Sequence, residues 1–252
     1  MNSTSCLFQF LVLLLTLIVA PGANGQESPI RALLITGGGW HDYDSQKQLL
    51  TEGIKERLGD GIEWTIIHED EGAPGHQVSV LKQENWSEDY DVVVHNTGYA
   101  RVRDSDFVAR FVEHHKGTPA VLIHAAIQSY RFAEPADPWF AFVGLQSMVS
   151  EDPGQIEIEN VNQSHPVMED IPEMFVMSED EVYITEKIWG DITLQARTYG
   201  EETQEYQPVT WTHEADSTRV FATTLGHSNE TFRQEEFLTM VANGILWAVG
   251  RR

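Results

Sequence analysis

The first half of the chain alternates short apolar runs with amphipathic segments. Branched aliphatic residues dominate four runs of strand length, which are bounded by glycines or polar turn residues. Such runs are typical of parallel strands that are buried on both faces. The predicted strands are 30–36, 62–68, 90–94 and 119–123.

Apolar residues at helical spacing separate these runs. The spacing predicts helices over 46–58 and 104–115, and a short helix near 78–81. Strands that alternate with helices are typical of a parallel sheet with helices on both faces. The pattern through residue 124 therefore predicts a doubly wound α/β fold.

The second half of the chain is less regular, and prolines mark its loops. Its predicted strands are 155–161, 181–184 and 192–199. We expect this stretch to form an insertion that covers one end of the sheet. A strand at 219–225 and a helix at 235–249 then close the domain. We therefore expect one α/β domain over 30–250 with a mainly parallel sheet.

The N-terminal segment has the pattern of a secretory signal. Residues 7–20 are almost entirely apolar but too few for a typical membrane-spanning helix, and small residues follow at 23–25. This predicts a signal peptide over 1–25 and a secreted or periplasmic protein; a retained N-terminal anchor is the alternative. No second apolar stretch has spanning length, so we expect no membrane contact once the signal is removed.

Composition excludes several classes of function. The only cysteine, Cys6, lies in the predicted signal, which leaves the mature chain without a disulfide, a thiolate metal site or a cysteine nucleophile. The formal net charge is −23, and such a surface repels nucleic acid. We expect a small-molecule partner and no nucleic acid; the oligomeric state stays open.

Four histidines stand at or just past the ends of apolar runs: His41, His95, His124 and His227. In a doubly wound sheet this is the edge where ligands bind. Imidazole titrates near neutral pH and is the commonest metal ligand, so the cluster indicates proton transfer or metal chemistry. His124 follows four apolar residues at a sharp strand-to-helix turn, where it is either a general base or a metal ligand.

Further residues are candidates for the walls of the same site. The glycines 37–39 lack dinucleotide and P-loop spacing, so we expect no nucleotide cofactor and a tight turn that presents His41 and Asp42. One of the three neighbouring acidic residues Glu179, Asp180 and Glu181 could orient a histidine or bind a cation, although a solvated acidic turn is the simpler interpretation. The substrate-binding candidates are Trp40, Asp42, His95, Tyr130, Trp211 and His213. Aromatic rings stack on sugars, although core packing explains each of them equally well.

Six short motifs occur in the order that is found in ThuA-like proteins, the trehalose-utilisation family. They are 38–42 (GGWHD), 123–126 (IHAA), 164–167 (SHPV), 180–183 (DEVY), 208–211 (PVTW) and 219–227 (RVFATTLGH). The chain resembles this family over residues 31–249.

The resemblance implies a class I glutamine amidotransferase-like fold, a flavodoxin-like three-layer sandwich. It also implies a role in disaccharide catabolism, including glycosides that are oxidised to a keto-sugar. A pocket of His41, His124, Glu181 and His227 follows from it, with the three histidines as ligands of a divalent metal such as zinc. Glutaminase chemistry is excluded because the mature chain has no cysteine.

The leading hypothesis is a carbohydrate enzyme that uses histidine and glutamate as acid and base. Removal of a proton beside a keto group and hydrolysis by a metal-activated water both stay open. One rival is a non-catalytic sugar-binding module. A second rival hypothesis is that the histidines have a purely structural role. It predicts that replacing them lowers the stability of the protein instead of its activity.

Overall fold

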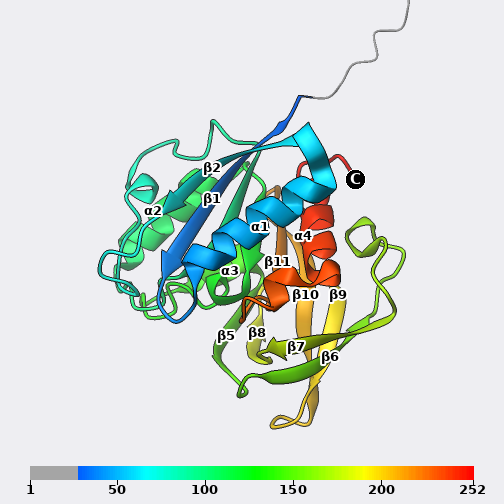
Figure 1. Cartoon of the computed structure of the whole chain (residues 1–252). Coiled ribbons are helices and arrows are strands. Elements are labelled where there is room, and N and C mark those ends of the chain that lie inside the picture. Colours follow the sequence, from blue (N-terminus) through cyan, green and yellow to red (C-terminus); the bar gives the residue numbers. More distant parts are fainter. Residues whose placement is uncertain (1–27) are drawn as a thin grey trace, which may run out of the picture.

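The computed structural model describes residues 28–252, and nine strands form one sheet in this part of the chain. They are β1 (Ile30–Gly38), β2 (Ile62–His68), β3 (Val92–Gly98), β4 (Ala120–Ile123), β6 (Gly154–Asn160), β7 (Met174–Asp180), β9 (Thr193–Gly200), β10 (Glu205–Ala215) and β11 (Thr218–Thr223). Their order across the sheet is β2-β1-β3-β4-β11-β10-β9-β6-β7 (Figure 1). A separate pair of strands is β5 (Leu145–Ser150) and β8 (Tyr183–Ile188).

The sheet is mixed, with a parallel half and an antiparallel half. Strands β2, β1, β3, β4 and β11 are parallel to one another, whereas β10, β9, β6 and β7 pair in antiparallel fashion. The parallel half matches the strands that the apolar runs predict. The second half extends the sheet instead of covering its end, which corrects the expected insertion. The predicted α/β fold with a parallel sheet is confirmed in part, because antiparallel strands make the whole sheet mixed.

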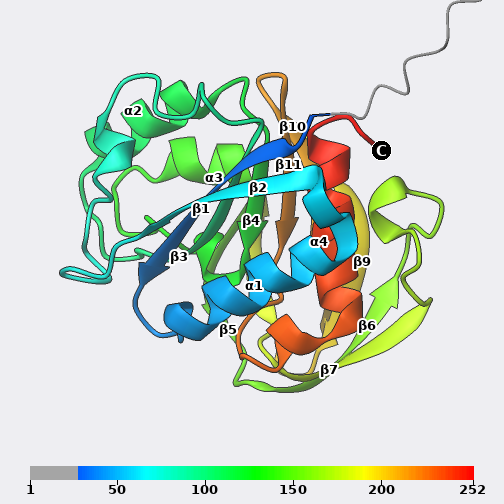
Figure 2. The same ribbon diagram turned by 45° about the horizontal axis from the view of Figure 1, so that its top comes forward.

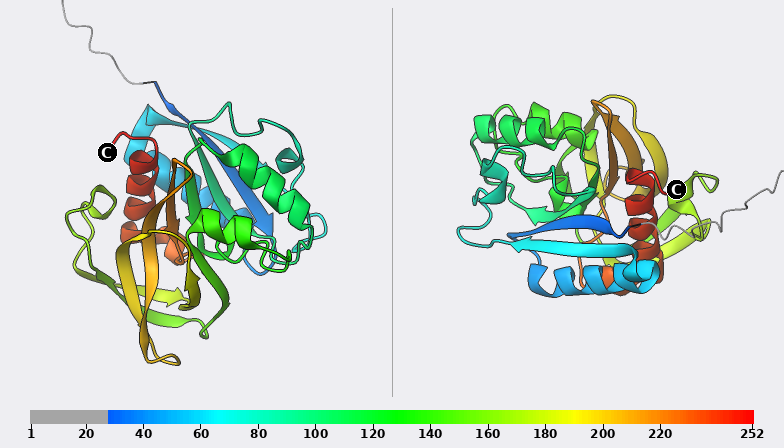
Figure 3. Two further views of the ribbon diagram at one scale, coloured as in Figure 1. Left: turned by 180° about the vertical axis from the view of Figure 1, so that it is seen from behind. Right: turned by 90° about the horizontal axis from the view of Figure 1, so that it is seen from above.

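Four α-helices pack on the two faces of the sheet. They are α1 (Tyr43–Leu58), α2 (Ser105–His115), α3 (Asp137–Val143) and α4 (Glu235–Ala248). Helices α1 and α4 lie together on one face, and α2 and α3 lie on the other (Figures 2 and 3). Successive strand residues therefore enter different apolar clusters: Leu33 packs with the side of α2, and Leu34 packs with the side of α1.

The sequence patterns missed three strands and one helix. Strands β5, β7 and β10 and helix α3 are absent from the prediction, and Pro208 is expected in a loop. Pro208 instead lies within β10, beside a register irregularity where the strand tolerates a residue without an N–H. One-sided burial leaves only a weak apolar pattern, as in β7, whose buried and exposed residues alternate.

Local signals set the first helix boundary. Helix α1 begins at Tyr43, three residues earlier than predicted, because the Asp42 carboxylate accepts a hydrogen bond from the Ser45 N–H at 3.1 Å and caps the helix. No helix within residues 28–252 has the length and apolarity to cross a membrane. The predicted signal peptide falls outside the described residues.

Candidate functional site

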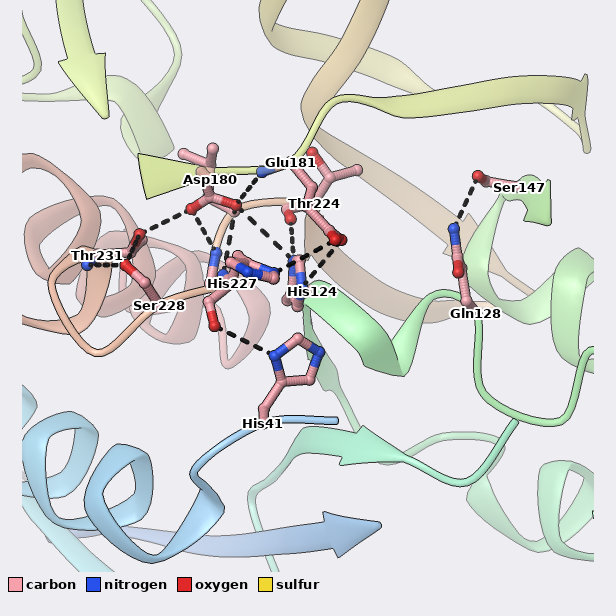
Figure 4. A network of polar contacts seen from close by, with 12 residues as sticks. His41, His124, Gln128, Ser147, Asp180, Glu181, Thr224, His227, Ser228 and Thr231 are labelled. Carbon is pink, nitrogen blue, oxygen red and sulfur yellow. Dashed lines mark hydrogen bonds and ion pairs between the residues drawn. The ribbon is translucent and has the colours of Figure 1, made fainter. Parts of the chain in front are cut away.

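Three histidines converge at the carboxyl edge of the parallel half. His41 follows β1, His124 follows β4 directly, and His227 lies four residues beyond β11 (Figure 4). Parallel strands end at the same edge, so residues that are far apart in the sequence meet there. The structure thus brings together three of the four histidines that the apolar runs single out.

Glycines allow these turns to pass close to one another. Gly38 has φ +112°, and a Cβ there would lie 2.6 Å from the Gly98 backbone. Gly226 has φ +129°, and a Cβ there would lie 2.9 Å from the His124 Cβ. Because only glycine fits both positions, the turns that carry His41 and His227 can close over the strand ends.

The three imidazoles face one another. Their ring centroids are 4.7 Å apart for His41 and His124, 5.2 Å for His41 and His227, and 5.5 Å for His124 and His227. One nitrogen from each ring lies within 4.8 Å of the other two. The three rings thus form one group of candidate metal donors.

Backbone carbonyls fix two of the rings. His41 Nδ1 donates to the His227 carbonyl at 3.1 Å, and His124 Nδ1 donates to the Thr224 carbonyl at 2.6 Å. A carbonyl only accepts, so the Nδ1 atoms carry the protons and the Nε2 atoms keep their lone pairs. The Nε2 atom of His124 is buried and has no hydrogen-bond partner.

Glu181 lies against the histidines. Its carboxylate is 3.6 Å from His124 Nε2 and 3.4 Å from His227 Nδ1 (Figure 4). Burial opposes ionisation of Glu181, but the contacts with His227, His124 and His41 outweigh it and lower its pKa. Glu181 is therefore a carboxylate at neutral pH.

The same surroundings keep two imidazoles neutral. Burial, together with the neighbouring rings, lowers the pKa of His41 to about 3, and burial lowers that of His124 to about 4. The hydrogen-bonding and charge contacts with Glu181 raise the pKa of His227. At neutral pH, His41 and His124 thus offer lone pairs instead of protons.

The side chain of Asp180 holds the backbone segments that carry Glu181 and His227 in position. The fully buried carboxylate accepts hydrogen bonds from the N–H groups of Gly226 at 2.9 Å, Glu181 at 2.9 Å and His227 at 3.3 Å, and from the Thr231 hydroxyl at 2.8 Å. Burial raises its pKa to about 6, although these hydrogen bonds oppose the rise. Asp180 is a positioning residue that sequence reasoning did not single out; its place beside Glu181 at the end of a strand was the available signal.

A pocket of about 420 Å³ opens beside the histidines and Glu181. His41, His227, Glu181 and Tyr183 form part of its wall, and Trp40, which is 58% exposed, lies at its mouth. Further lining residues come from three other segments: Gly98, Ala100, Ala125, Gln128, Arg131, Met148, Val149 and Ser150. Gln128 and Arg131 belong to the pocket without any pattern in the sequence that indicated them.

The structure does not bring the remaining candidates to this pocket. His95 is buried in the core beside His115, and Tyr130 packs against Phe111. Trp211 is fully buried, and its indole donates to the Val143 carbonyl at 2.9 Å.

His213 and Asp42 also have other surroundings. His213 lines a different cavity, between α2, α3 and β10, and its Nε2 lies 3.1 Å from the Ala141 carbonyl. Asp42 caps α1 and also accepts from the Asn229 amide at 2.8 Å. Of the predicted substrate-binding residues, Trp40 is the one that lines the pocket.

The model of the ThuA family, described as trehalose utilisation, matches residues 31–248. The chain belongs to the ThuA family. This agrees with the six motifs in the sequence and indicates a role in carbohydrate metabolism. A search of the curated proteins finds no match.

Solved structures of ThuA-like proteins share the fold. One from Parabacteroides merdae has 18% identity and a TM-score of 0.71, covering 89% of this chain and 91% of that one. Another from Bacteroides uniformis has 18% identity and a TM-score of 0.66, covering 91% and 95%.

A more distant neighbour, named as one component of a GMP synthase from Thermoplasma acidophilum, has 14% identity and a TM-score of 0.50, covering 86% of this chain and 96% of that one. Together these likenesses show a mixed α/β fold of the glutamine amidotransferase type.

Proposed function

We propose that this ThuA-family chain is a metal-assisted enzyme of carbohydrate catabolism that acts on a glycoside or keto-sugar. The observation that carries the proposal is the set of three facing imidazoles, joined by Glu181, beside a pocket whose wall includes His41, His227 and Glu181. A predicted signal peptide supports a place outside the cytoplasm.

The donor set fits a divalent cation of the zinc type. Histidines that bind zinc almost always donate their second nitrogen to a carbonyl or carboxylate, and His41 and His124 both donate in this way. The unpartnered His124 Nε2 is the lone pair that such an ion would take up. His41, His124 and His227 would hold the ion, and three protein ligands are typical of catalytic zinc sites.

A divalent cation at this place would supply polarisation of a substrate carbonyl or of a water molecule. The chain itself supplies the proton acceptor. Glu181 is ionised, part-buried and open to the pocket, so it is the group that accepts a proton from a C–H bond beside a keto group or from water. His41 and His124, which are neutral, are ligands instead of acids.

Trp40 supports sugar as the substrate class. Its ring is largely exposed where it lines the pocket, and its backbone has a positive φ of +81°. An exposed aromatic face beside a polar pocket is suited to stacking on a sugar ring. The same feature would also serve a sugar-binding module without catalysis.

Turnover separates the enzyme from the binding module. Wild type, His124→Ala and the matched control His114→Ala, which changes a histidine of α2, would be incubated with trehalose, other disaccharides and their keto derivatives. We expect wild type and control to convert at least one of them, a chelator to stop the reaction and zinc to restore it. His124→Ala should still bind the sugar without converting it. Sugar binding by zinc-loaded wild type without any product would instead identify a binding module.

A further inference from the structure

Three arginines lie on two segments that border the pocket of this very acidic chain, and we call them the mouth arginines: Arg101, Arg103 and Arg131. Arg131 lines the pocket, and its guanidinium lies 5.4 Å from the centroid of the Phe132 ring. Arg103 approaches the same ring at 5.8 Å, and Arg101 lies 5.7 Å from the centroid of Trp40. Hydrogen bonds between the two segments, such as that from the Phe132 N–H to the Ala100 carbonyl at 3.3 Å, hold these mouth arginines together.

In the described part of the chain, no carboxylate forms an ion pair with the mouth arginines, although the charge of Glu181 acts on Arg131 from a greater distance. Within residues 28–252, no carboxylate lies within 4.0 Å of the guanidinium of Arg101, Arg103 or Arg131, although the chain has 39 acidic residues against 16 basic ones. Among these residues, five other arginines pair with a carboxylate at 3.0 Å or less, whereas Arg110 and Arg219 do not; the five are Arg31, Arg57, Arg197, Arg233 and Arg252. The positive charge at the mouth is thus left for another molecule to neutralise.

Neutral groups hold Arg131 in place. Its Nη1 donates to the Gln128 side-chain oxygen, and the Gln128 amide donates to the Ser147 hydroxyl at 3.1 Å (Figure 4). Its Nε is buried and has no hydrogen-bond partner. An N–H donor left unpaired in a part-buried place is costly unless a ligand pairs with it, and the guanidinium stays charged at any ordinary pH.

We propose that the sugar bound in this pocket carries an anionic group, a carboxylate or a phosphate, that the mouth arginines bind, with Arg131 as the main contact. This rests on the proposed function, in which the pocket binds a sugar. Guanidinium groups bind carboxylates and phosphates through paired N–H donors. A local positive mouth also attracts an anion that the rest of a surface with net charge −23 repels.

Calorimetric titration of the zinc-loaded protein with glucuronate, glucose 6-phosphate and glucose tests the inference. We expect at least one acidic sugar to bind about tenfold more tightly than glucose, and the advantage to shrink as salt is added. Which acidic sugar has the advantage tells the carboxylate from the phosphate. Arg131→Gln, and Arg101→Gln at a more exposed position, should reduce the ratio of acidic to neutral affinity. The control Arg110→Gln removes the same charge from α2, away from the pocket, and should keep the ratio.

Equal affinity for glucose and both acidic sugars would overturn the inference. So would the absence of acidic-sugar binding, or an identical ratio in the Arg131 and Arg110 variants. Metal content and turnover, measured on the same samples, distinguish this failure from failure of the proposed function. If the protein prefers acidic sugars but holds no metal and converts no sugar, the proposed enzyme function is refuted and the inference about the anionic group stands. If it converts neutral sugars and shows no preference for acidic ones, the enzyme function stands and the inference is refuted.

Discussion

Two groups of histidines in this fold differ in burial and in surroundings. His41, His124 and His227 meet at the strand ends beside a pocket and a carboxylate. His95 in β3 and His115 in α2 meet in the core, where their Nε2 atoms are 3.0 Å apart and the rings of Trp86 and Trp139 surround them.

The two groups differ in whether a ligand can reach the imidazoles, because both groups contain a ring nitrogen without a hydrogen-bond partner. His115 Nδ1 donates to the Thr118 carbonyl, which leaves His115 Nε2 to accept from His95. His95 Nδ1 is buried without a partner, as His124 Nε2 is. An unpartnered imidazole nitrogen therefore indicates a ligand site only where other donors and open space face it.

Removal of a single ligand should give the largest effect. We expect His41→Ala to weaken zinc affinity at least about 100-fold, because even groups behind the ligands contribute about 10–100-fold. Competition with a zinc chelator measures this. Unchanged affinity would place the ion elsewhere or show that none binds.

The core pair should respond in stability instead. His95→Ala leaves a cavity among aromatic rings and should lower the free energy of unfolding by about 2–4 kcal/mol, by analogy with large-to-small core substitutions. Urea unfolding measures the loss, and zinc content should stay at the wild-type level. If a folded His95 variant loses its zinc, the core histidines also affect metal binding, and the division into a metal-binding group and a structural group is wrong.

Asp180 should affect both metal binding and stability, because its buried carboxylate holds the backbone on which Glu181 and His227 lie. Asp180→Asn keeps the volume but replaces one acceptor oxygen with an amide, so at least one of four donors loses its partner. We expect zinc affinity to fall about 10–100-fold and stability to fall by about 1–3 kcal/mol. A loss of stability with full zinc affinity would limit Asp180 to a structural role.

The smallest effect is expected at the mouth. Trp40→Ala removes an exposed ring, so the melting temperature and zinc content should not change. Sugar affinity should fall by about 0.5–1.5 kcal/mol, the typical contribution of an aromatic contact. Calorimetric titration of the folded, zinc-loaded variant with the sugar checks this. If the variant binds the sugar as tightly as wild type does, Trp40 does not contact the sugar.

The site residues that the sequence predicts correctly are those that directly follow the ends of parallel strands. His41, His124 and His227 follow strands β1, β4 and β11, which share one edge, so apolar runs alone indicate their convergence. His95 has the same apparent context, but β3 continues to Gly98. His95 therefore lies inside the strand and points into the α2 side of the core instead of past the edge.

Other features lacked a sequence pattern. Arg131 and Gln128 lie in an irregular segment after β4, where position depends on the packing of several distant segments. Strand β7 has one exposed face, and β10 contains Pro208 and several polar residues, so neither strand has a long apolar run. Prediction therefore succeeded for strands with a clear apolar run or alternation, such as β1, β3, β4 and β6, and failed for β5, β7 and β10.

Elemental mass spectrometry of the purified, tag-free protein tests the central claim most directly. We expect close to one zinc or related transition-metal ion per chain in wild type and in His95→Gln, and almost none in a folded His124→Ala/His227→Ala double variant. A well-folded wild type that holds no metal, even after incubation with zinc and other divalent ions, would contradict the account and leave metal-free acid-base chemistry or sugar binding for this pocket.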